Sequence, residues 1–461
     1  MAADARSQAF FLLNKLQQRK HTLDYYLEEL DRKAVFTDKR ERALFNALAF
    51  GVLRQRARLD YVLKQFSSKP LADLDVEVLN LLRLALFQIM FMDKIPESAA
   101  VNTAVDIAKK YKPKAAGFVN AVLRKSAAGY STVELPDITQ NKVRHLSVKH
   151  ALPQWLVTRW LKRFDHENLE KIAADINTLP PLTLRVNTLK TDPAALMDQL
   201  HDAAAKTAGG AFIATALNLT KPNCAVPELP GYSAGLFMVQ DEAAQLTVAL
   251  VDPRPGESVL DTCAGIGGKT LSMAIAAQNR VQILATDMTA AKLNRIHEES
   301  ARLGLTPPET RTVDWLKPLP EIEAALNNAR GVTRLFDKVL VDAPCSGLGV
   351  LRRNPDTKWS MHENDLAALA QRQLSILRKA AAFVKPGGAL VYTVCSTEPE
   401  ETVAILEKFL ENNAGFVVDN ATGLLPEKFI AETAPHHGGF CTYPYCYTMD
   451  GFFMIRFTRQ N

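Results

Sequence analysis

Between Ser258 and Cys345 the chain alternates between short apolar runs and helical segments. Four of these runs end at an aspartate, and in chain order these are Asp261, Asp287, Asp314 and Asp342. Alternation of this kind is typical of a parallel sheet whose strands are joined by crossover helices. Ligands of such sheets bind just beyond the carboxyl ends of the strands. We therefore expect an α/β domain with one crevice lined by several carboxylates.

Two of the expected strands also deliver a thiol to that crevice. The stretch V-L-V-D-A-P-C-S-G-L-G (339–349) falls from an apolar run onto Cys345, and A-L-V-Y-T-V-C-S-T (389–397) ends in the same way at Cys395. Pro and Gly close the first run, which is typical of a buried strand leading into a loop. A lone cysteine on a strand is usually inert, but two at the same sheet edge indicate function.

The glycine-rich loop after the first strand, C-A-G-I-G-G-K (263–269), allows three interpretations. A phosphate-binding P-loop requires glycine where Cys263 stands, and a dinucleotide fingerprint requires glycine where Thr270 stands. A glycine turn still lets a ligand lie against the backbone. S-adenosylmethionine offers a ribose diol, an adenine amine and a cationic tail, all of which suit carboxylate or backbone acceptors. The loop and the four aspartates therefore favour this methyl donor.

A thiol beside a methyl donor suits a carbon target that must first be activated. C5 of cytosine is a poor nucleophile, and addition of a thiolate to C6 makes C5 reactive. Such catalysis needs a thiol with a lowered pKa. Thr397 and Glu400 resemble a capping box for a helix over 399–412, whose positive N-terminal end would favour a thiolate at Cys395. Chemistry alone leaves open which of the two cysteines attacks.

The N-terminal third differs in composition from the rest of the chain. Residues 1–130 carry 22 Lys and Arg against 14 Asp and Glu, whereas residues 241–461 carry 22 against 26. Apolar residues recur at helical spacing up to about residue 128, and 79–92 is apolar on nearly every side, as expected of a central helix. A basic helical bundle with a polyanionic partner follows from this pattern, although a solvated basic face explains the charge equally well.

The domain organisation follows from these changes in pattern. We expect an all-helical domain over residues 1–130, a helical linker and small α+β subdomain over 131–240, and the Rossmann-like α/β domain over 241–461. Several cations outside the first domain are candidates for contacts with an RNA backbone. These are Arg185, Lys190, Arg352, Arg353 and Lys358.

Other classes of protein are disfavoured by the sequence. The six cysteines are scattered without Cys-x-x-Cys spacing, so we expect free thiols and no metal site. No apolar run is long enough to span a membrane, and the N-terminus lacks a signal segment. We expect a cytoplasmic protein that works as a monomer.

The motifs resemble those of known RNA-modifying proteins. I-P-E-S-A-A-V-N-T-A-V-D-I-A-K with G-F-V-N-A-V-L-R is similar to the RNA-binding domain of the antitermination factor NusB. D-A-P-C-S-G-L-G, L-R-R-N-P-D-T-K-W and Y-T-V-C-S-T resemble the RNA cytosine-5 methyltransferases. Together they are similar to the bacterial Sun/Fmu type, which methylates 16S ribosomal RNA. The expected fold is thus a class I methyltransferase domain preceded by an α+β subdomain and a NusB-like domain.

The resemblance implies a role for each motif residue. Cys395 would be the nucleophile, Cys345 would assist elimination of the product, and Asp342 would orient the cytosine and the donor. In DNA cytosine methyltransferases the Pro-Cys thiol attacks instead, so these roles rest on the resemblance. The donor-binding residues that it implies are Cys263, Ala264, Gly265, Ile266, Gly267, Gly268, Lys269, Asp287, Asp314 and Asp342.

Two positions depart from the family pattern, and other functions stay open. Gly265-Ile266 stands where the family usually has Ala-Pro, and Val394 stands where it usually has Thr. Alternatives are an RNA-binding or ribosome-assembly factor that has lost activity, a methyltransferase acting on transfer RNA, and a nucleotide hydrolase using Gly268-Lys269-Thr270. An unpaired cytosine that can be splayed out of its stack is the expected target.

Overall fold

The computed structural model of the protein describes residues 4–327, 334–421, 423–433 and 437–461. The chain divides into two compact units. The first contains residues 1–178 together with the segment Leu351–Glu363, and the second contains residues 179–350 and 364–461. The division after Thr178 differs from the boundaries after residues 130 and 240 that the sequence indicated.

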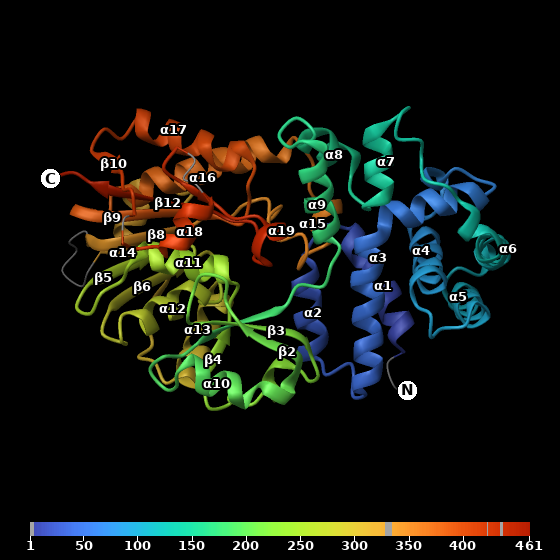
Figure 1. Ribbon diagram of the computed structural model, residues 1–461, viewed down its shortest axis with the longest axis horizontal. Helices are drawn as coiled ribbons and strands as arrows, with labels where there is room; N and C mark the ends of the chain where they lie inside the picture. The colour runs from blue at the N-terminus through green and yellow to red at the C-terminus, as the bar shows by residue number, and fades with distance from the viewer. Residues whose placement is uncertain (1–3, 328–333, 422, 434–436) are drawn as a thin grey trace. The chain divides into compact units, whose positions relative to one another are not determined.

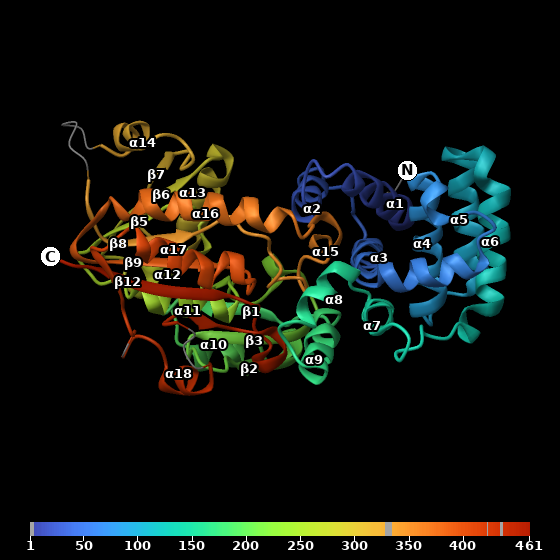
Figure 2. The same cartoon turned by 90° about the horizontal axis from the view of Figure 1, so that it is seen from above.

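The first unit is helical throughout its described residues. Its α-helices are α1 (Ala5–Gln17), α2 (Leu23–Arg32), α3 (Lys39–Phe66), α4 (Val76–Phe91), α5 (Glu97–Tyr111), α6 (Ala116–Gly129), α7 (Lys142–Lys149), α8 (Gln154–Trp160), α9 (His166–Ile176) and α15 (Thr357–Ser360). Helices α4, α5 and α6 lie side by side (Figure 2). The basic helical bundle expected from the sequence is therefore present.

Local signals explain where the helices of this bundle begin and which one lies at its centre. The side chain of Asp38 accepts a hydrogen bond from Arg40 N and so caps α3. Most residues of α4 are buried, as the apolar run over 79–92 predicted. Arg83 on α4 is buried too, and its guanidinium is paired with both carboxylate oxygens of Asp60 at 2.6 and 2.7 Å. Pairing of this kind is what lets a buried helix carry a charge.

The second unit begins with a small antiparallel sheet of order β2-β3-β1-β4. Its strands are β1 (Leu182–Val186), β2 (Ala204–Gly209), β3 (Ala216–Pro222) and β4 (Phe237–Val239), and α10 (Pro193–Gln199) follows β1. Leu184, Leu217 and Phe237 share its apolar core with Leu196 of α10. Strand β2 was not expected from the sequence, because its residues A-A-K-T-A-G contain neither aromatic nor aliphatic β-branched side chains.

A larger sheet of order β10-β12-β9-β8-β5-β6-β7 forms the centre of the second unit. Its strands are β5 (Ser258–Asp261), β6 (Gln282–Asp287), β7 (Glu309–Thr312), β8 (Phe336–Asp342), β9 (Val384–Val394), β10 (Phe416–Val418), β12 (Phe453–Arg459) and β11 (Phe440–Cys441), which pairs with β12. Strands β5 to β9 pair in parallel, and β12 joins β9 antiparallel. This is the Rossmann-like sheet that the alternation of strands and helices predicted.

Helices cover both faces of this sheet. The helices that accompany the larger sheet are α11 (Glu242–Val251), α12 (Gly268–Ala276), α13 (Ala290–Leu303), α14 (Leu319–Leu326), α16 (Asp365–Ala381), α17 (Val403–Glu411), α18 (Glu427–Thr433) and α19 (Pro444–Tyr447). Helices α16 and α17 lie above the sheet and α11 and α12 below it in Figure 1. Each group packs an apolar core of its own against the strands. The carboxyl ends of the parallel strands are therefore held between two rigid layers.

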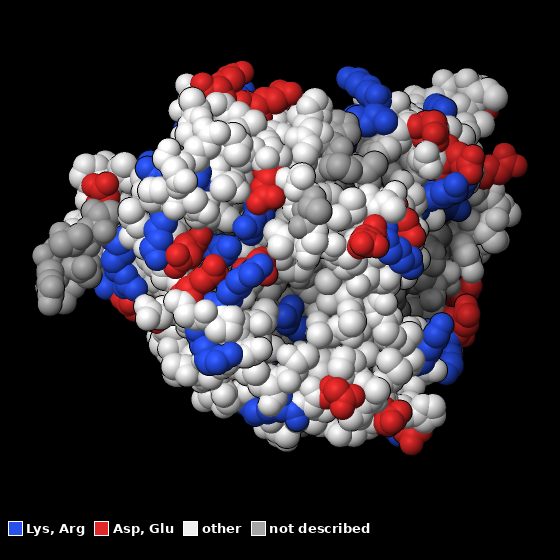
Figure 3. All heavy atoms as spheres, turned by 60° about the vertical axis from the view of Figure 1, so that its left-hand side comes forward, with Lys and Arg blue, Asp and Glu red and all other residues white. Residues whose placement is uncertain are grey.

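The surface carries charges of both signs. Lys and Arg side chains are interspersed with Asp and Glu side chains on the face drawn in Figure 3. A phosphate backbone approaching this face would meet carboxylates as well as cations, so net charge alone does not mark a binding surface there. Among the described residues, no helix combines the length and the apolarity needed to cross a bilayer.

Candidate active site

The two cysteines singled out in the sequence lie together at the edge of the large sheet. Strands β8 and β9 are neighbours in parallel register, with Asp342 opposite Thr393. Cys345 and Cys395 follow these two positions, and their Sγ atoms are 3.1 Å apart. Parallel strands end at the same edge of a sheet, which is why two residues fifty positions apart meet. The two thiols therefore lie next to each other at this edge of the sheet, as the sequence predicted.

A buried carboxylate that the sequence did not reveal ties the two cysteine loops together. Glu401 is 0% exposed and accepts hydrogen bonds from Ser346 N at 2.8 Å and from the hydroxyls of Ser346 and Ser396, each at 2.5 Å. Gln373 Nε2 of α16 donates to the same carboxylate at 2.8 Å. Ser346 and Ser396 directly follow the two cysteines, so this one carboxylate holds both thiol-bearing loops. A Ser after each Cys, with a Glu soon after the second, is the signal that could have predicted it.

Close backbone packing fixes the loop after Cys345. Gly349 N donates to Cys395 O at 3.0 Å, and Gly451 N donates to Gly349 O at 2.8 Å. A Cβ atom on Gly349 would lie 1.8 Å from Gly451 O, which no side chain can occupy. Glycine is required at 349 so that the three backbones can approach one another.

An ion pair lies at the end of β8, close to the thiols. Lys269 Nζ of α12 donates to Asp342 Oδ2 at 2.6 Å. Burial lowers the pKa of Lys269, but the carboxylate of Asp342 and interaction with Cys395 outweigh burial, and the net pKa is raised. Lys269 is therefore an ammonium group beside the catalytic candidates.

The two thiols are not equivalent. The hydrogen bond with Cys395 is the largest cause that raises the pKa of Cys345 well above its usual value, followed by burial and the charges of Cys395 and Glu401. In the resting site Cys345 therefore keeps its proton, which it can donate to Cys395. The helix that was expected to favour a thiolate at Cys395 is arranged differently. A 3-10 turn (Pro399–Glu401) precedes α17, and neither start carries a side-chain cap, so the expected capping box is not formed.

The glycine loop has an open, turned backbone. Gly267 has φ 91° and Gly265 has φ 57°, the left-handed conformation that favours glycine. Gly265 N donates to Asp287 Oδ2 at 3.2 Å, so the carboxylate at the end of β6 braces the loop. A Cβ atom on Gly265 would meet nothing within 4 Å, which shows space in front of the turn. The turned backbone and the open space at Gly265 are compatible with the ligand cradle that the sequence predicts, and binding of the donor there stays a prediction.

Other residues of the expected donor site lie around this loop. Asp314 follows β7, and its Oδ1 accepts from Leu316 N at 2.9 Å. Burial raises the pKa of Cys263 to about 12, so its thiol stays neutral. Two exposed apolar side chains, Ile266 (49% exposed) and Met288 (67%), come from the glycine loop and from the residue after Asp287. Apolar side chains beside a glycine turn and carboxylates fit an adenosyl ligand, whose ring is apolar on its faces and polar at its edges.

Two cations of the first unit that were expected to contact RNA are instead buried. Arg352 is 2% exposed and pairs with Asp175 at 3.2 Å, within the first unit. Lys358 is 1% exposed, and its Nζ donates to Arg54 O, Ala151 O and Asn177 Oδ1. These two side chains stabilise the first unit and are not available to a phosphate backbone.

Similar reasoning applies to the small sheet of the second unit. Arg185 is buried on β1 and therefore cannot reach an RNA backbone. Burial also lowers its pKa to about 10. Lys190 is exposed, with its Nζ donating to Ala234 O at 2.8 Å. Arg353 is partly exposed.

Among the described residues, no group of three or more His, Cys, Asp or Glu is arranged to hold a metal ion.

Comparison with protein families matches three parts of the chain. Residues 248–458 match the family described as 16S rRNA methyltransferase RsmB/F, and residues 3–128 match the NusB family. Residues 152–227 match the ferredoxin-like domain of the RsmF/B-like methyltransferases.

Curated proteins are similar over nearly the whole length. The probable ribosomal RNA small subunit methyltransferase B of Bacillus subtilis is 35% identical over 459 residues, which cover 99% of each chain. The ribosomal RNA small subunit methyltransferase B of Pseudomonas putida is 35% identical and covers 82% of this chain and 83% of its own.

Solved structures share the fold at lower identity. The structure titled "Crystal Structure of PH0851" has a TM-score of 0.80 at 23% identity and covers 99% of both chains. That of NSun6 from Pyrococcus horikoshii with SFG has a TM-score of 0.58 at 19% identity and covers 68% of this chain and 99% of its own. These structures show the fold alone. The family matches and the curated relatives place the chain in the RsmB/F family of ribosomal RNA methyltransferases, and it is an S-adenosylmethionine-dependent methyltransferase with a NusB-like N-terminal domain.

Proposed function

We propose that this protein methylates C5 of a cytosine in 16S ribosomal RNA through a transient covalent bond between Cys395 Sγ and C6 of the base. The observation that carries the proposal is the pair of thiols 3.1 Å apart at the ends of two parallel strands. One thiol is enough for a nucleophile, and the second supplies the proton transfer that ends the reaction. The choice of 16S ribosomal RNA as the substrate rests on relatives that are named as methyltransferases of the small ribosomal subunit RNA.

The covalent steps use the two cysteines in turn. Cys395 adds as a thiolate to C6, which forms a carbon–sulfur bond and moves an electron pair onto the ring, so that C5 becomes nucleophilic. S-adenosylmethionine, when bound, supplies the methyl group that C5 takes up. A base then removes the proton from C5, the ring electrons reform the C5–C6 double bond, and Cys395 leaves as a thiolate.

Cys345 is the base in this scheme, and its environment explains why it acts late. The hydrogen bond with Cys395 and the charge of Cys395 are two of the causes that raise its pKa. Both causes disappear once Cys395 Sγ is bonded to C6, because that sulfur then carries no charge and offers a weaker acceptor. Cys345 therefore releases its proton to water more easily in the adduct than in the resting site, and the thiolate so formed takes the proton from C5 at the stage where elimination needs a base.

Neighbouring groups orient the reactants. The ammonium of Lys269 fixes the carboxylate of Asp342, which can accept a hydrogen bond from the exocyclic amine of the cytosine. The loop Cys263–Lys269 would hold the donor together with Asp287 and Asp314. Ile266 and Met288 would contact its adenine ring, since both are apolar and exposed.

The contacts of the loop argue against nucleotide hydrolysis. Lys269 is engaged by Asp342, and Thr270 Oγ1 donates to the buried Asp261 at 2.7 Å. A P-loop would need both groups for phosphate and metal. We also propose that the protein works as a monomer in the cytoplasm, where its thiols stay reduced.

The test is transfer of a labelled methyl group from S-adenosylmethionine to 16S ribosomal RNA stripped of proteins. Cys395→Ala should abolish transfer. Cys345→Ala should accumulate a protein–RNA adduct that survives denaturing electrophoresis, because addition still occurs but elimination is slowed. Cys446→Ala, which removes an exposed thiol, is the matched control and should transfer normally.

Three outcomes would contradict the proposal. Adduct accumulation in Cys395→Ala rather than Cys345→Ala would exchange the two roles. Label on transfer RNA alone would change the substrate. Absence of label on every RNA, with RNA binding intact, would leave an assembly factor.

A further inference from the structure

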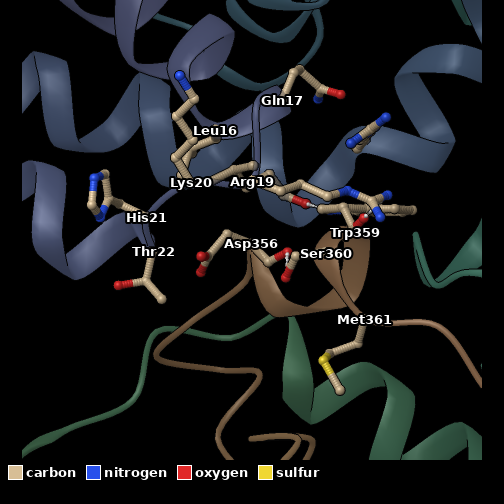
Figure 4. A pocket seen from close by; sticks show the side chains of 12 residues that line it. Leu16, Gln17, Arg19, Lys20, His21, Thr22, Asp356, Trp359, Ser360 and Met361 are labelled. Atoms are coloured by element: carbon tan, nitrogen blue, oxygen red, sulfur yellow. Dashed lines mark hydrogen bonds between the residues drawn. The ribbon is translucent and has the colours of Figure 1, made fainter. Parts of the chain in front are cut away.

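A hollow of about 250 Å³ lies within the first unit, away from the residues discussed so far. Its walls come from the end of α1 and the turn that follows, from α3, and from the segment 356–361 around α15. Figure 4 shows Arg19 reaching across it toward Trp359, and the side chain of Lys20 pointing away from Asp356. The volume is slightly below that of pockets for drug-sized ligands, so it suits a group of nucleotide size or smaller.

Cations dominate the lining. Arg19, Lys20 and Arg56 contribute three positive side chains, and Asp356 contributes the single carboxylate of the lining. Asp356 Oδ2 already accepts from Leu23 N at 3.1 Å and so serves the start of α2. Burial raises the pKa of Asp356, while hydrogen bonds from backbone N–H groups act in the opposite direction. The hollow is therefore positive overall.

Arg56 has no hydrogen-bonded anion among the described residues. It is half-buried, and burial lowers its pKa to about 10; the charge of Arg83 acts in the same direction, and that of Asp60, which is paired with Arg83, acts against it. Among the described residues no hydrogen bond or ion pair is made by its guanidinium, in contrast to Arg83, which is paired with Asp60. Desolvating a guanidinium without a partner is costly unless a ligand supplies the counter-charge.

An aromatic ring lies directly against this cation. The guanidinium of Arg56 lies 5.1 Å from the centre of the Trp359 ring, and Trp359 Nε1 donates to Leu53 O at 2.7 Å, which fixes the ring. Arg19 Nη2 donates to Trp359 O at 3.4 Å. Arginines arranged around a fixed aromatic ring are a recurrent platform for single-stranded nucleic acid, where phosphates meet cations and bases stack.

We propose that this hollow binds an unpaired nucleotide of the substrate RNA through its phosphate, with Arg56 as the main contact and Arg19 and Lys20 as supporting cations. The proposal rests on the proposed function only in taking RNA as the substrate. It assigns to the first unit a defined anchoring site rather than a diffuse positive face. A free phosphate anion offers the same chemistry as a phosphate group within RNA, so the test must separate these two ligands.

The test measures binding of a fluorescent single-stranded RNA octamer to the full-length protein by anisotropy, without methyl donor, over a range of salt concentrations. Arg56→Gln should lower affinity about tenfold, as expected for a lost charged hydrogen bond, and reduce the slope of log K against log salt by about 0.7. Lys20→Gln, at an exposed position that does not threaten folding, should act in the same direction. Arg58→Gln removes the same charge from the same helix outside the hollow and should leave binding unchanged.

The outcomes discriminate clearly. Equal losses in Arg56→Gln and Arg58→Gln, or none in Arg56→Gln and Lys20→Gln, would overturn the proposal. Competition by inorganic phosphate or cytidine monophosphate as effective per phosphate as unlabelled octamer would assign the hollow to a free anion and overturn it as well. Because no methyl transfer is measured, a selective loss in Arg56→Gln stands even if Cys395 proves not to be the nucleophile.

Discussion

The clearest perturbation of the catalytic edge is Glu401→Gln, which keeps the shape of the side chain and removes its charge. Glu401 accepts four hydrogen bonds, from Ser346 N, the hydroxyls of Ser346 and Ser396, and Gln373 Nε2. Hydrogen bonds to a charged group contribute ~1.5–3 kcal/mol each, against ~0.5–1.5 for neutral pairs. The amide also replaces one acceptor oxygen by a donor.

The expected effect has two parts. Losing about 1 kcal/mol on each of several bonds predicts a fall of roughly 2–4 kcal/mol in the free energy of unfolding. The thiols move with Ser346 and Ser396, and a displacement of ~1 Å at a reacting group can cost ~10²-fold in rate. We therefore expect kcat to fall about 100-fold with KM for RNA little changed, since Glu401 is buried and its carboxylate is bonded to protein groups.

The assay combines methyl-transfer kinetics with urea unfolding. Glu407→Gln, on an exposed position of α17, is the matched control and should change neither quantity. A purely structural role would lower the amount of active enzyme without altering kcat per folded molecule, so active sites are counted by adduct formation. Unchanged kcat per active site in Glu401→Gln would refute the idea that this carboxylate positions the thiols.

Two further predictions concern stability. Burial lowers the pKa of Lys358 to about 7 from its ordinary value of 10.5. Between these two pH values the unfolded chain binds more protons than the folded chain, so the contribution of Lys358 to the free energy of unfolding rises with pH. The difference in unfolding free energy between the protein and Lys358→Met should grow by about 2 kcal/mol from pH 7 to pH 9 in urea titrations, while Lys64→Met, at an exposed site, should show no such trend; a constant difference would contradict the shift. Gly349→Ala should lose transfer and several kcal/mol of stability, because its Cβ would overlap Gly451 O; normal melting and activity would show that this backbone contact can relax.

The sequence predicted the parts of the fold that depend on local pattern. Apolar runs ending in Asp or Cys specified β5, β6, β8 and β9, and the all-round apolar stretch specified α4. Strand β2 escaped prediction because pairing with β3, rather than its own side chains, makes it a strand.

The candidate site was predicted only where a motif names its residues. Cys345, Cys395 and the glycine loop are recognisable in one dimension, whereas Glu401 gains its role from Ser346, 55 residues away. The cations of L-R-R-N-P-D-T-K-W were misjudged for a related reason. They were expected to contact an RNA backbone, but Arg352 and Lys358 lie in the interior of the first unit. Charge in a sequence does not reveal which acceptors will surround it.

The segment Leu351–Glu363 belongs to the first unit although both of its neighbours in sequence belong to the second. No single cut can therefore release either unit with all of its own parts. A fragment ending at Thr178 would lack the Lys358 amine that bridges Arg54 O, Ala151 O and Asn177 Oδ1, and the remaining fragment would expose Trp359 and Lys358 to water. Recombination that exchanges N-terminal domains between relatives would have to carry these thirteen residues along with the first 178.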